Sequence, residues 1–139
     1  MLAPAIVIHD FIQAEAALMA ARDLRRPVTL TSAVGAIGYL GPRTFLKIVD
    51  AAAAAVPEAK FETVVNCGSE PGLALAALRH GATRIAVDIP TTTAARLSDI
   101  AGQQGATILP PVADALDLDG CDSPQKAATA YLMEATENV

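Results

Sequence analysis

The sequence predicts an α/β protein built around a parallel sheet, and three observations support this prediction. Short runs of β-branched and apolar residues alternate five times with longer segments in which Leu and Ala recur at helical spacing. Gly and Pro residues stand where these segments end, as expected at helix and strand boundaries. A hydrophobic content of 53% with only 18% charged residues is typical of a sheet covered on both faces, or of a large subunit interface. The 139 residues are expected to form a single domain, residues 1–139.

The first two units each pair a strand with a helix. Residues 5–8 form the first predicted strand, and residues 13–25 the first helix, with Asp10 as its N-cap and Pro27 closing it. The apolar positions that recur in this helix are Ala14, Ala17, Leu18, Ala21 and Leu24. A second strand contains Val28 and Leu30, a Gly-rich connection covers residues 35–42, and a helix follows from Pro42 through Ala55, closed by Pro57.

The third unit, residues 61–82, is the central strand–turn–helix unit of the chain and the one most relevant to a functional site. Its strand contains Val64 and Val65, its polar turn covers residues 66–69, and its helix is rich in Leu and Ala and ends at Gly81. Ligands of parallel α/β folds bind at the carboxyl ends of the strands. We therefore expect the turn at residues 66–70 to form a wall of any functional site.

The last units complete a βα pattern that is repeated five times. A strand is predicted over residues 84–89, a helix over 91–105 and a short strand over 107–109. Residues 114–122 are acidic and predicted to be a loop, with the apolar pair Ala115-Leu116 as a candidate extension of a neighbouring element. A final amphipathic helix begins at Ser123-Pro124 and runs to about residue 137. Two architectures fit this order: an open doubly wound sheet, or a truncated barrel of the TIM type.

Charge and cysteine content exclude several classes of partner. The net charge of −5 and the scattered basic residues argue against a nucleic-acid partner. No apolar run approaches the roughly 18 residues that span a membrane, and no basic region precedes the first apolar run, so we expect neither a membrane segment nor a signal peptide. Cys67 and Cys121 form no CxxC pair and no disulfide framework, which fits a cytoplasmic location.

Six segments follow one another in an order that is found in a known family. They are DFIQAEAAL (10–18), RPVTL (26–30), GAIGYLG (35–41), VVNCG (64–68), LALAALRHGATRIAVD (73–88) and DSPQKAATAY (122–131). In this order and spacing they resemble the class II (metal-dependent) fructose-bisphosphate aldolases and related ketose-bisphosphate aldolases. The resemblance covers residues 6–137. It implies a barrel-type fold and an ancestry among lyases that act on sugar phosphates with a divalent metal such as zinc.

The departures from the family pattern bear directly on function. The family's Asp-His-Gly turn, whose Asp is the catalytic acid/base and whose His binds the metal, corresponds here to Asn66-Cys67-Gly68. An amide cannot take up and return a proton as a carboxylate does. The family's serine near the end of the second strand falls at Ala33, with Ser32 one position away. The resemblance therefore implies a shortened, degenerate relative, a pseudoenzyme that has lost the usual aldol mechanism.

The candidate site residues are those expected at the carboxyl ends of the strands. Candidates for catalysis are Asn66, Cys67 and Asp88, and candidates for ligand binding are His9, Asp10, Ser32, Asn66 and Cys67. Each has a structural alternative: Cys67 as a small residue in a tight turn, His9 and Asp10 as exposed capping residues, Asp88 as the cap of the next helix. Cys67 alone is a weak metal candidate, because one ligand does not make a site. No cofactor is expected unless the lyase interpretation holds.

Five strands cannot close a barrel, which typically has eight strands in about 250 residues. An isolated half-barrel would expose edge strands and an apolar concave face, which natural proteins avoid. We therefore expect a homodimer or higher homo-oligomer. The leading functional hypothesis is a module without aldolase activity that binds a small molecule or serves regulation or assembly. The alternatives are a lyase whose site is completed across subunits by His9, Asp10, Cys67 and Asp88, or a thiol-dependent activity at Cys67.

Overall fold

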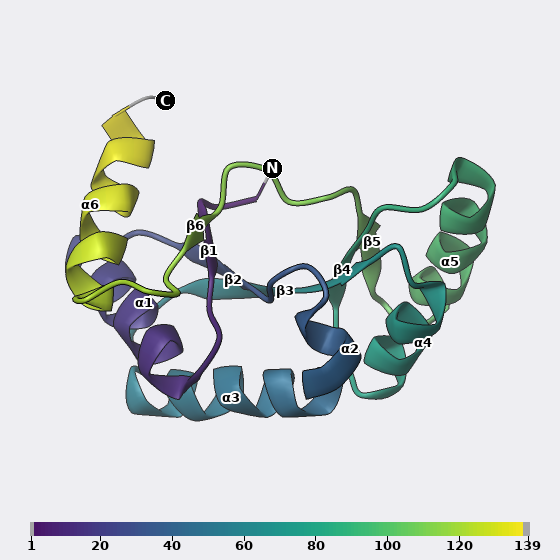
Figure 1. Cartoon of the computed structure of the whole chain (residues 1–139), viewed down its shortest axis with the longest axis horizontal. Coiled ribbons are helices and arrows are strands. Elements are labelled where there is room, and N and C mark those ends of the chain that lie inside the picture. The colour runs from purple at the N-terminus through teal and green to yellow at the C-terminus, as the bar shows by residue number, and fades with distance from the viewer. Residues whose placement is uncertain (1, 138–139) are drawn as a thin grey trace.

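Six parallel strands form one sheet in the computed structural model, which describes residues 2–137. The strand order is β5-β4-β3-β2-β1-β6 (Figure 1). The strands are β1 (Ala5–Val7), β2 (Val28–Thr31), β3 (Phe61–Gly68), β4 (Arg84–Val87), β5 (Thr107–Leu109) and β6 (Leu116–Asp117). Every neighbouring pair is parallel. The predicted α/β class with a parallel sheet is thus confirmed.

The helices form a single row that follows the order of the strands. They are α1 (Phe11–Leu24), α2 (Ala36–Leu40), α3 (Pro42–Ala55), α4 (Pro71–Arg79), α5 (Thr91–Gln103) and α6 (Pro124–Glu137). α6 contacts α1, α1 contacts α3, α3 contacts α4, and α4 contacts α5 (Figure 1). From β1 to β5 the strands advance toward one edge, so right-handed crossovers place these helices on one face. Both predicted architectures, an open sheet and a truncated barrel, are consistent with this arrangement.

β6 corrects the prediction that residues 114–122 are a loop. Leu116 pairs with Ile6 and Asp117 with Val7, so β6 lies beside β1, at the opposite edge from β5. Residues 110–115 connect these two edges without a helix, and Figure 1 shows them on the side of the sheet away from α3. A second correction concerns residues 36–40, which form the short helix α2 inside the predicted Gly-rich connection.

Several predicted boundaries have clear local causes. Asp10 caps α1: its Oδ1 accepts a hydrogen bond from the Gln13 amide at 2.8 Å. The Gln13 side chain in turn accepts a hydrogen bond from the His9 amide at 2.8 Å. The side chains of Asp10 and Gln13 thus both accept backbone hydrogen bonds at the start of the helix, as in a capping box. Pro42 and Pro71 each begin a helix, the position where a missing N–H costs nothing.

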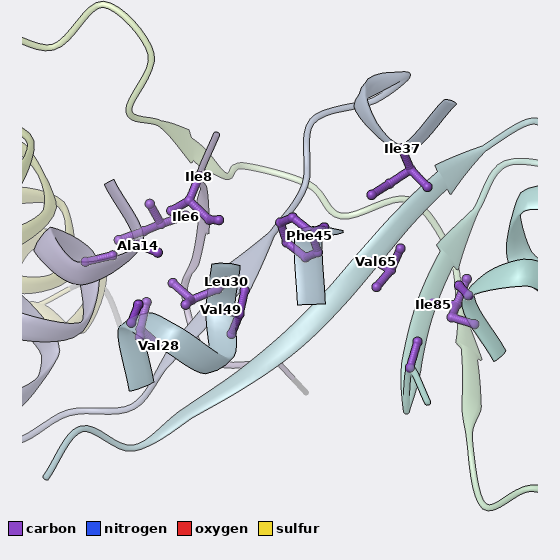
Figure 2. Close-up of a cluster of buried hydrophobic side chains, with 14 of the residues drawn as sticks. Ile6, Ile8, Ala14, Val28, Leu30, Ile37, Phe45, Val49, Val65 and Ile85 are labelled. Carbon is purple, nitrogen blue, oxygen red and sulfur yellow. The ribbon is translucent and has the colours of Figure 1, made fainter. Parts of the chain in front are cut away.

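The hydrophobic core lies between the sheet and the row of helices. Figure 2 shows Ile6, Val28, Leu30, Val65 and Ile85 from the strands facing Ala14, Phe45 and Val49 from α1 and α3. Side chains alternate along each strand, so the intervening residues point to the other face of the sheet. Burying this core supplies the main favourable free energy of folding.

The face of the sheet without helices is covered by the chain itself. Thr29, Val64 and Ala86 lie on this face and are fully buried. Residues 110–114 line a hollow together with residues 2–5, and Thr29 Oγ1 donates a hydrogen bond to the Ala3 carbonyl at 2.9 Å. The N-terminal segment and the β5–β6 connection therefore lie against the face that an isolated five-strand sheet would expose. No helix within residues 2–137 has the length and apolar character needed to cross a membrane.

Candidate functional site

Ser32 and Asn66 lie together at the carboxyl ends of β2 and β3. Thr31 pairs with Val64, which brings the ends of the two strands to the same level. The Ser32 Oγ accepts a hydrogen bond from the Asn66 backbone amide at 2.9 Å. Both residues are largely buried, with exposed fractions of 1% and 8%. Both are predicted ligand-binding residues, and the structure brings them into contact.

The Asn66 side chain is held in one orientation and keeps a free donor. Its Oδ1 accepts a hydrogen bond from the Gly68 amide at 3.1 Å. Within residues 2–137 no protein acceptor is bonded to Nδ2, and no side-chain polar atom there is both fully buried and unpaired. The Nδ2 group therefore reaches solvent and can donate to a bound molecule. The Ser32 hydroxyl hydrogen also has no protein acceptor in this part of the chain.

β3 contains a β-bulge directly after Asn66, at Cys67. Asn66 pairs with Ala86 but Gly68 pairs with Val87, so Cys67 is an extra residue in the ladder. Gly68 has φ = +56°, a conformation that glycine adopts without strain. Bulges of this kind turn the strand and re-aim side chains, and they are frequent beside functional sites.

Cys67 points into the core instead of joining Ser32 and Asn66. Its side chain is 3% exposed and belongs to the hydrophobic cluster between sheet and helices. Burial, and secondarily the carboxylate of Glu70, raise the pKa of the Cys67 thiol to about 11. A thiol that stays protonated at neutral pH is a poor nucleophile and a poor metal ligand. The structure thus favours the structural interpretation of Cys67 over its candidacy as a catalytic or ligand-binding residue.

His9 meets a carboxylate that the sequence analysis did not select. His9 Nε2 lies 2.7 Å from Asp117 Oδ1, at the point where β1 and β6 end. The same Asp117 oxygen accepts a hydrogen bond from the Asp119 amide at 2.9 Å. Asp117 was missed because its segment was predicted to be a loop. The apolar pair Ala115-Leu116, directly before Asp117 in the acidic segment, is the sequence feature that indicates a short strand here.

The remaining candidates lie apart from these two pairs. Asp10 is the N-cap of α1, which is the structural alternative predicted for it. The Asp88 amide donates to the Gly68 carbonyl at 2.8 Å, but its exposed side chain lies in a hollow with Thr91 and Ser98 near the start of α5. Within residues 2–137 no group of three His, Cys, Asp or Glu side chains could hold a metal ion.

Comparison with known proteins supports the fold only. No family model matches the chain, and no curated protein matches it. Among solved structures, a similar fold occurs in a probable tagatose 6-phosphate kinase from Sinorhizobium meliloti 1021, with a TM-score of 0.53 and 19% sequence identity. The match covers 98% of this chain and 46% of that one, so this chain spans less than half of that protein. The resemblance to class II aldolases stays a prediction, because that protein is named as a kinase.

Proposed function

We propose that this chain is an aldolase-type truncated barrel without aldolase catalysis, and that it binds a polar small molecule at the carboxyl ends of β2 and β3. The observation that carries the proposal is the buried Ser32–Asn66 pair, which presents hydrogen-bond donors but no group that can shuttle a proton. The protonated, inward-facing Cys67 supports the same conclusion, because it removes the neighbouring nucleophile.

The free donor of Asn66 indicates the class of ligand. Asn66 Nδ2 can donate to an oxygen atom, so a ligand rich in hydroxyl and carbonyl oxygens matches it, while the buried Ser32 hydroxyl holds the Asn66 backbone in place. The resemblance to ketose-bisphosphate aldolases indicates sugars and sugar phosphates within that class. A few fixed polar groups at strand ends are the usual means of orienting such ligands.

The proposal is tested by ligand-dependent thermal stabilisation across a panel of ketoses and ketose phosphates. A ligand that binds only the folded chain raises its melting temperature. The Asn66→Ala variant should bind about fivefold more weakly, the loss expected for one hydrogen bond. Gln104→Ala, an exposed amide at the end of α5, is the matched control and should behave as wild type. Equal stabilisation of wild type and Asn66→Ala would refute a site at Asn66.

The second candidate function is a lyase completed across subunits, and the His9–Asp117 pair favours it. A carboxylate 2.7 Å from a ring nitrogen orients an imidazole for general-base catalysis. Of the four predicted site residues, Cys67 faces the core and Asp10 caps α1, so in this candidate His9 and Asp88 would be complemented by a second subunit and a divalent metal. Elemental mass spectrometry of protein purified without chelators discriminates the two candidates. About one zinc per chain or per dimer, with turnover of a ketose bisphosphate, would favour the lyase.

We also propose that the chain assembles as a homodimer or higher homo-oligomer. Three apolar side chains at the carboxyl end of the sheet are strongly exposed: Ile12 at 68%, Val34 at 77% and Tyr39 at 86%. Ile12 lies in the first turn of α1, Val34 precedes α2 and Tyr39 belongs to α2, so all three follow the neighbouring strands β1 and β2. Exposed apolar groups of this kind are typical of interfaces. A monomeric native mass at micromolar concentration would contradict the assembly.

A further inference from the structure

A basic hollow lies at the end of the sheet opposite Ser32 and Asn66. It is formed by the last turn of α1, the residues that enter β2, and the segment that precedes β3. Its lining residues are Ala21, Arg22, Asp23, Arg25, Arg26, Glu58 and Lys60. Four of the ten Lys and Arg residues of the chain therefore surround one hollow, in a protein whose net charge is −5.

Three of the four cations have no acidic partner. Arg22 Nε donates to Asp23 Oδ1 at 3.0 Å, which engages the Asp23 carboxylate. The other ion pairs within residues 2–137 are His9–Asp117 and Glu62–Arg84, so Arg25, Arg26 and Lys60 remain unpaired. Glu58 is the one remaining carboxylate of the hollow, and it is exposed. The hollow thus holds an excess of positive charge that the protein itself does not neutralise.

The backbone fixes the two segments that carry these cations. The Arg26 amide donates to the Ala21 carbonyl at 3.0 Å, and the Val28 amide donates to the Lys60 carbonyl at 3.2 Å. Arg25 has φ = +56° and caps α1 by donating to the Ala21 and Arg22 carbonyls. Glycine is the residue that usually takes this position, because a side chain there is strained.

A cation near a helix C-terminus suits the helix dipole, which accounts for Arg22 and in part for Arg25. It does not account for Arg26 and Lys60, which lie beyond the helix on two different segments. Arg25, Arg26 and Lys60 line one hollow without carboxylate partners, and their N–H donors match the oxygens of a tetrahedral oxyanion.

We propose that this hollow binds a phosphate dianion, either free or as the phosphate group of a small monoester, through Arg25, Arg26 and Lys60. The Arg25 and Arg26 guanidinium groups supply planar pairs of N–H donors, and Lys60 supplies a point charge from the segment that precedes β3. The site is independent of the proposed ligand site at Asn66, because the two lie at opposite ends of the strands.

Amide chemical shifts recorded during titrations of the full chain test the proposal. The probes are inorganic phosphate and glycerol 3-phosphate, each added at constant ionic strength balanced with sodium chloride. We expect saturable shifts at residues 21–26 and 58–60, and tighter binding of glycerol 3-phosphate would identify a monoester as the preferred ligand. Shifts that do not saturate, that chloride reproduces, or that centre on residues 32 and 66 would overturn the site.

The variants are chosen to remove charge without disturbing the fold. Arg25→Gly relieves the positive φ, so weaker binding by this variant cannot be attributed to unfolding. Arg26→Gln and Lys60→Gln keep most of the side-chain volume. Each should weaken phosphate binding about tenfold, the loss expected for a charge-assisted hydrogen bond. Lys47→Gln, an exposed position on α3, is the control. Unchanged affinity in Arg25→Gly and Arg26→Gln would contradict the proposal.

Discussion

Asn66 and Cys67 show how two adjacent residues of one turn take different roles. Asn66 lies at the strand end beside Ser32, while Cys67 is on the same face of β3 as Val65 and is directed toward the helices. In the predicted resemblance to class II aldolases, both residues correspond to functional groups of the family. Here the Asn66 side chain can only donate and accept hydrogen bonds, and Cys67 is buried as a neutral thiol. These properties support the proposal that this turn binds a ligand without catalysis.

Cys67 should react slowly with iodoacetamide at neutral pH. Burial raises its pKa to about 11, so almost none of the reactive thiolate is present near pH 7, and access is restricted as well. Cys121 is partly exposed and serves as the internal control. Labelling followed by mass spectrometry in Cys67→Ser and Cys121→Ser variants separates the two rates. Fast labelling of Cys67 in the folded chain would revive the thiol-dependent hypothesis.

The raised pKa of Cys67 also predicts how stability changes with pH. Between pH 9 and about pH 11 the thiol ionises in the unfolded chain while it stays protonated in the folded one. The folded state then binds more protons, so its stability falls as pH rises through this range. Urea unfolding of wild type and Cys67→Ala at pH 8 and pH 10 should show a smaller pH-dependent loss in the variant. Equal losses would mean that Cys67 is solvated in the folded state.

At the level of elements, β6 decides how the sheet is completed. It pairs with β1 over two residues and is further tied by the Leu118 amide, which donates to the Val7 carbonyl at 3.2 Å. The His9–Asp117 contact joins the same two elements at their carboxyl ends. Tyr131 Oη donates to the Asp114 carbonyl at 2.7 Å, which holds the segment before β6 against α6.

Asp117→Ala should loosen β6 without unfolding the domain. The side chains of His9 and Asp117 are 28% and 52% exposed, so we expect a loss of at most about 1 kcal/mol in the free energy of unfolding. Amide hydrogen exchange at Leu118 should accelerate, because local opening of β6 becomes easier. Asp117→Asn is the conservative control, since its Oδ1 can still accept from the Asp119 amide. Unchanged exchange at Leu118 in Asp117→Ala would show that β6 does not depend on this contact.

The elements that were predicted correctly are those whose signals are local. Asp10 as the N-cap of α1 and Pro42 at the start of α3 follow from the conformational preferences of those residues. β6 could not be predicted in this way, because a two-residue strand has no periodicity and its contact to His9 spans 108 positions in the chain. The inward direction of Cys67 follows from alternation, since Cys67 lies two residues beyond the core residue Val65. The register shift between Asn66 and Gly68 could not be predicted, because only the pairing with β4 defines it.

At the scale of the whole molecule, the chain covers a sheet that it does not close into a barrel. The helices protect one face, and the N-terminal segment together with residues 110–115 lies against the other. The two ends of the strands carry different polar residues: Ser32 and Asn66 lie at the carboxyl ends, and the basic hollow lies at the amino ends. These are the two separate places where we propose that small ligands bind.

The most direct test of the central claim follows the side-chain amide signals of Asn66 while a ketose phosphate is titrated. Binding without catalysis predicts saturable shifts of the Asn66 Nδ2 protons, because this group is the free donor of the site. No signals of cleaved ketose phosphate should appear over hours, because Ser32 and Asn66 include no acid/base group. Absence of any shift at Asn66, or the appearance of cleaved ligand in the same tube, would contradict the account.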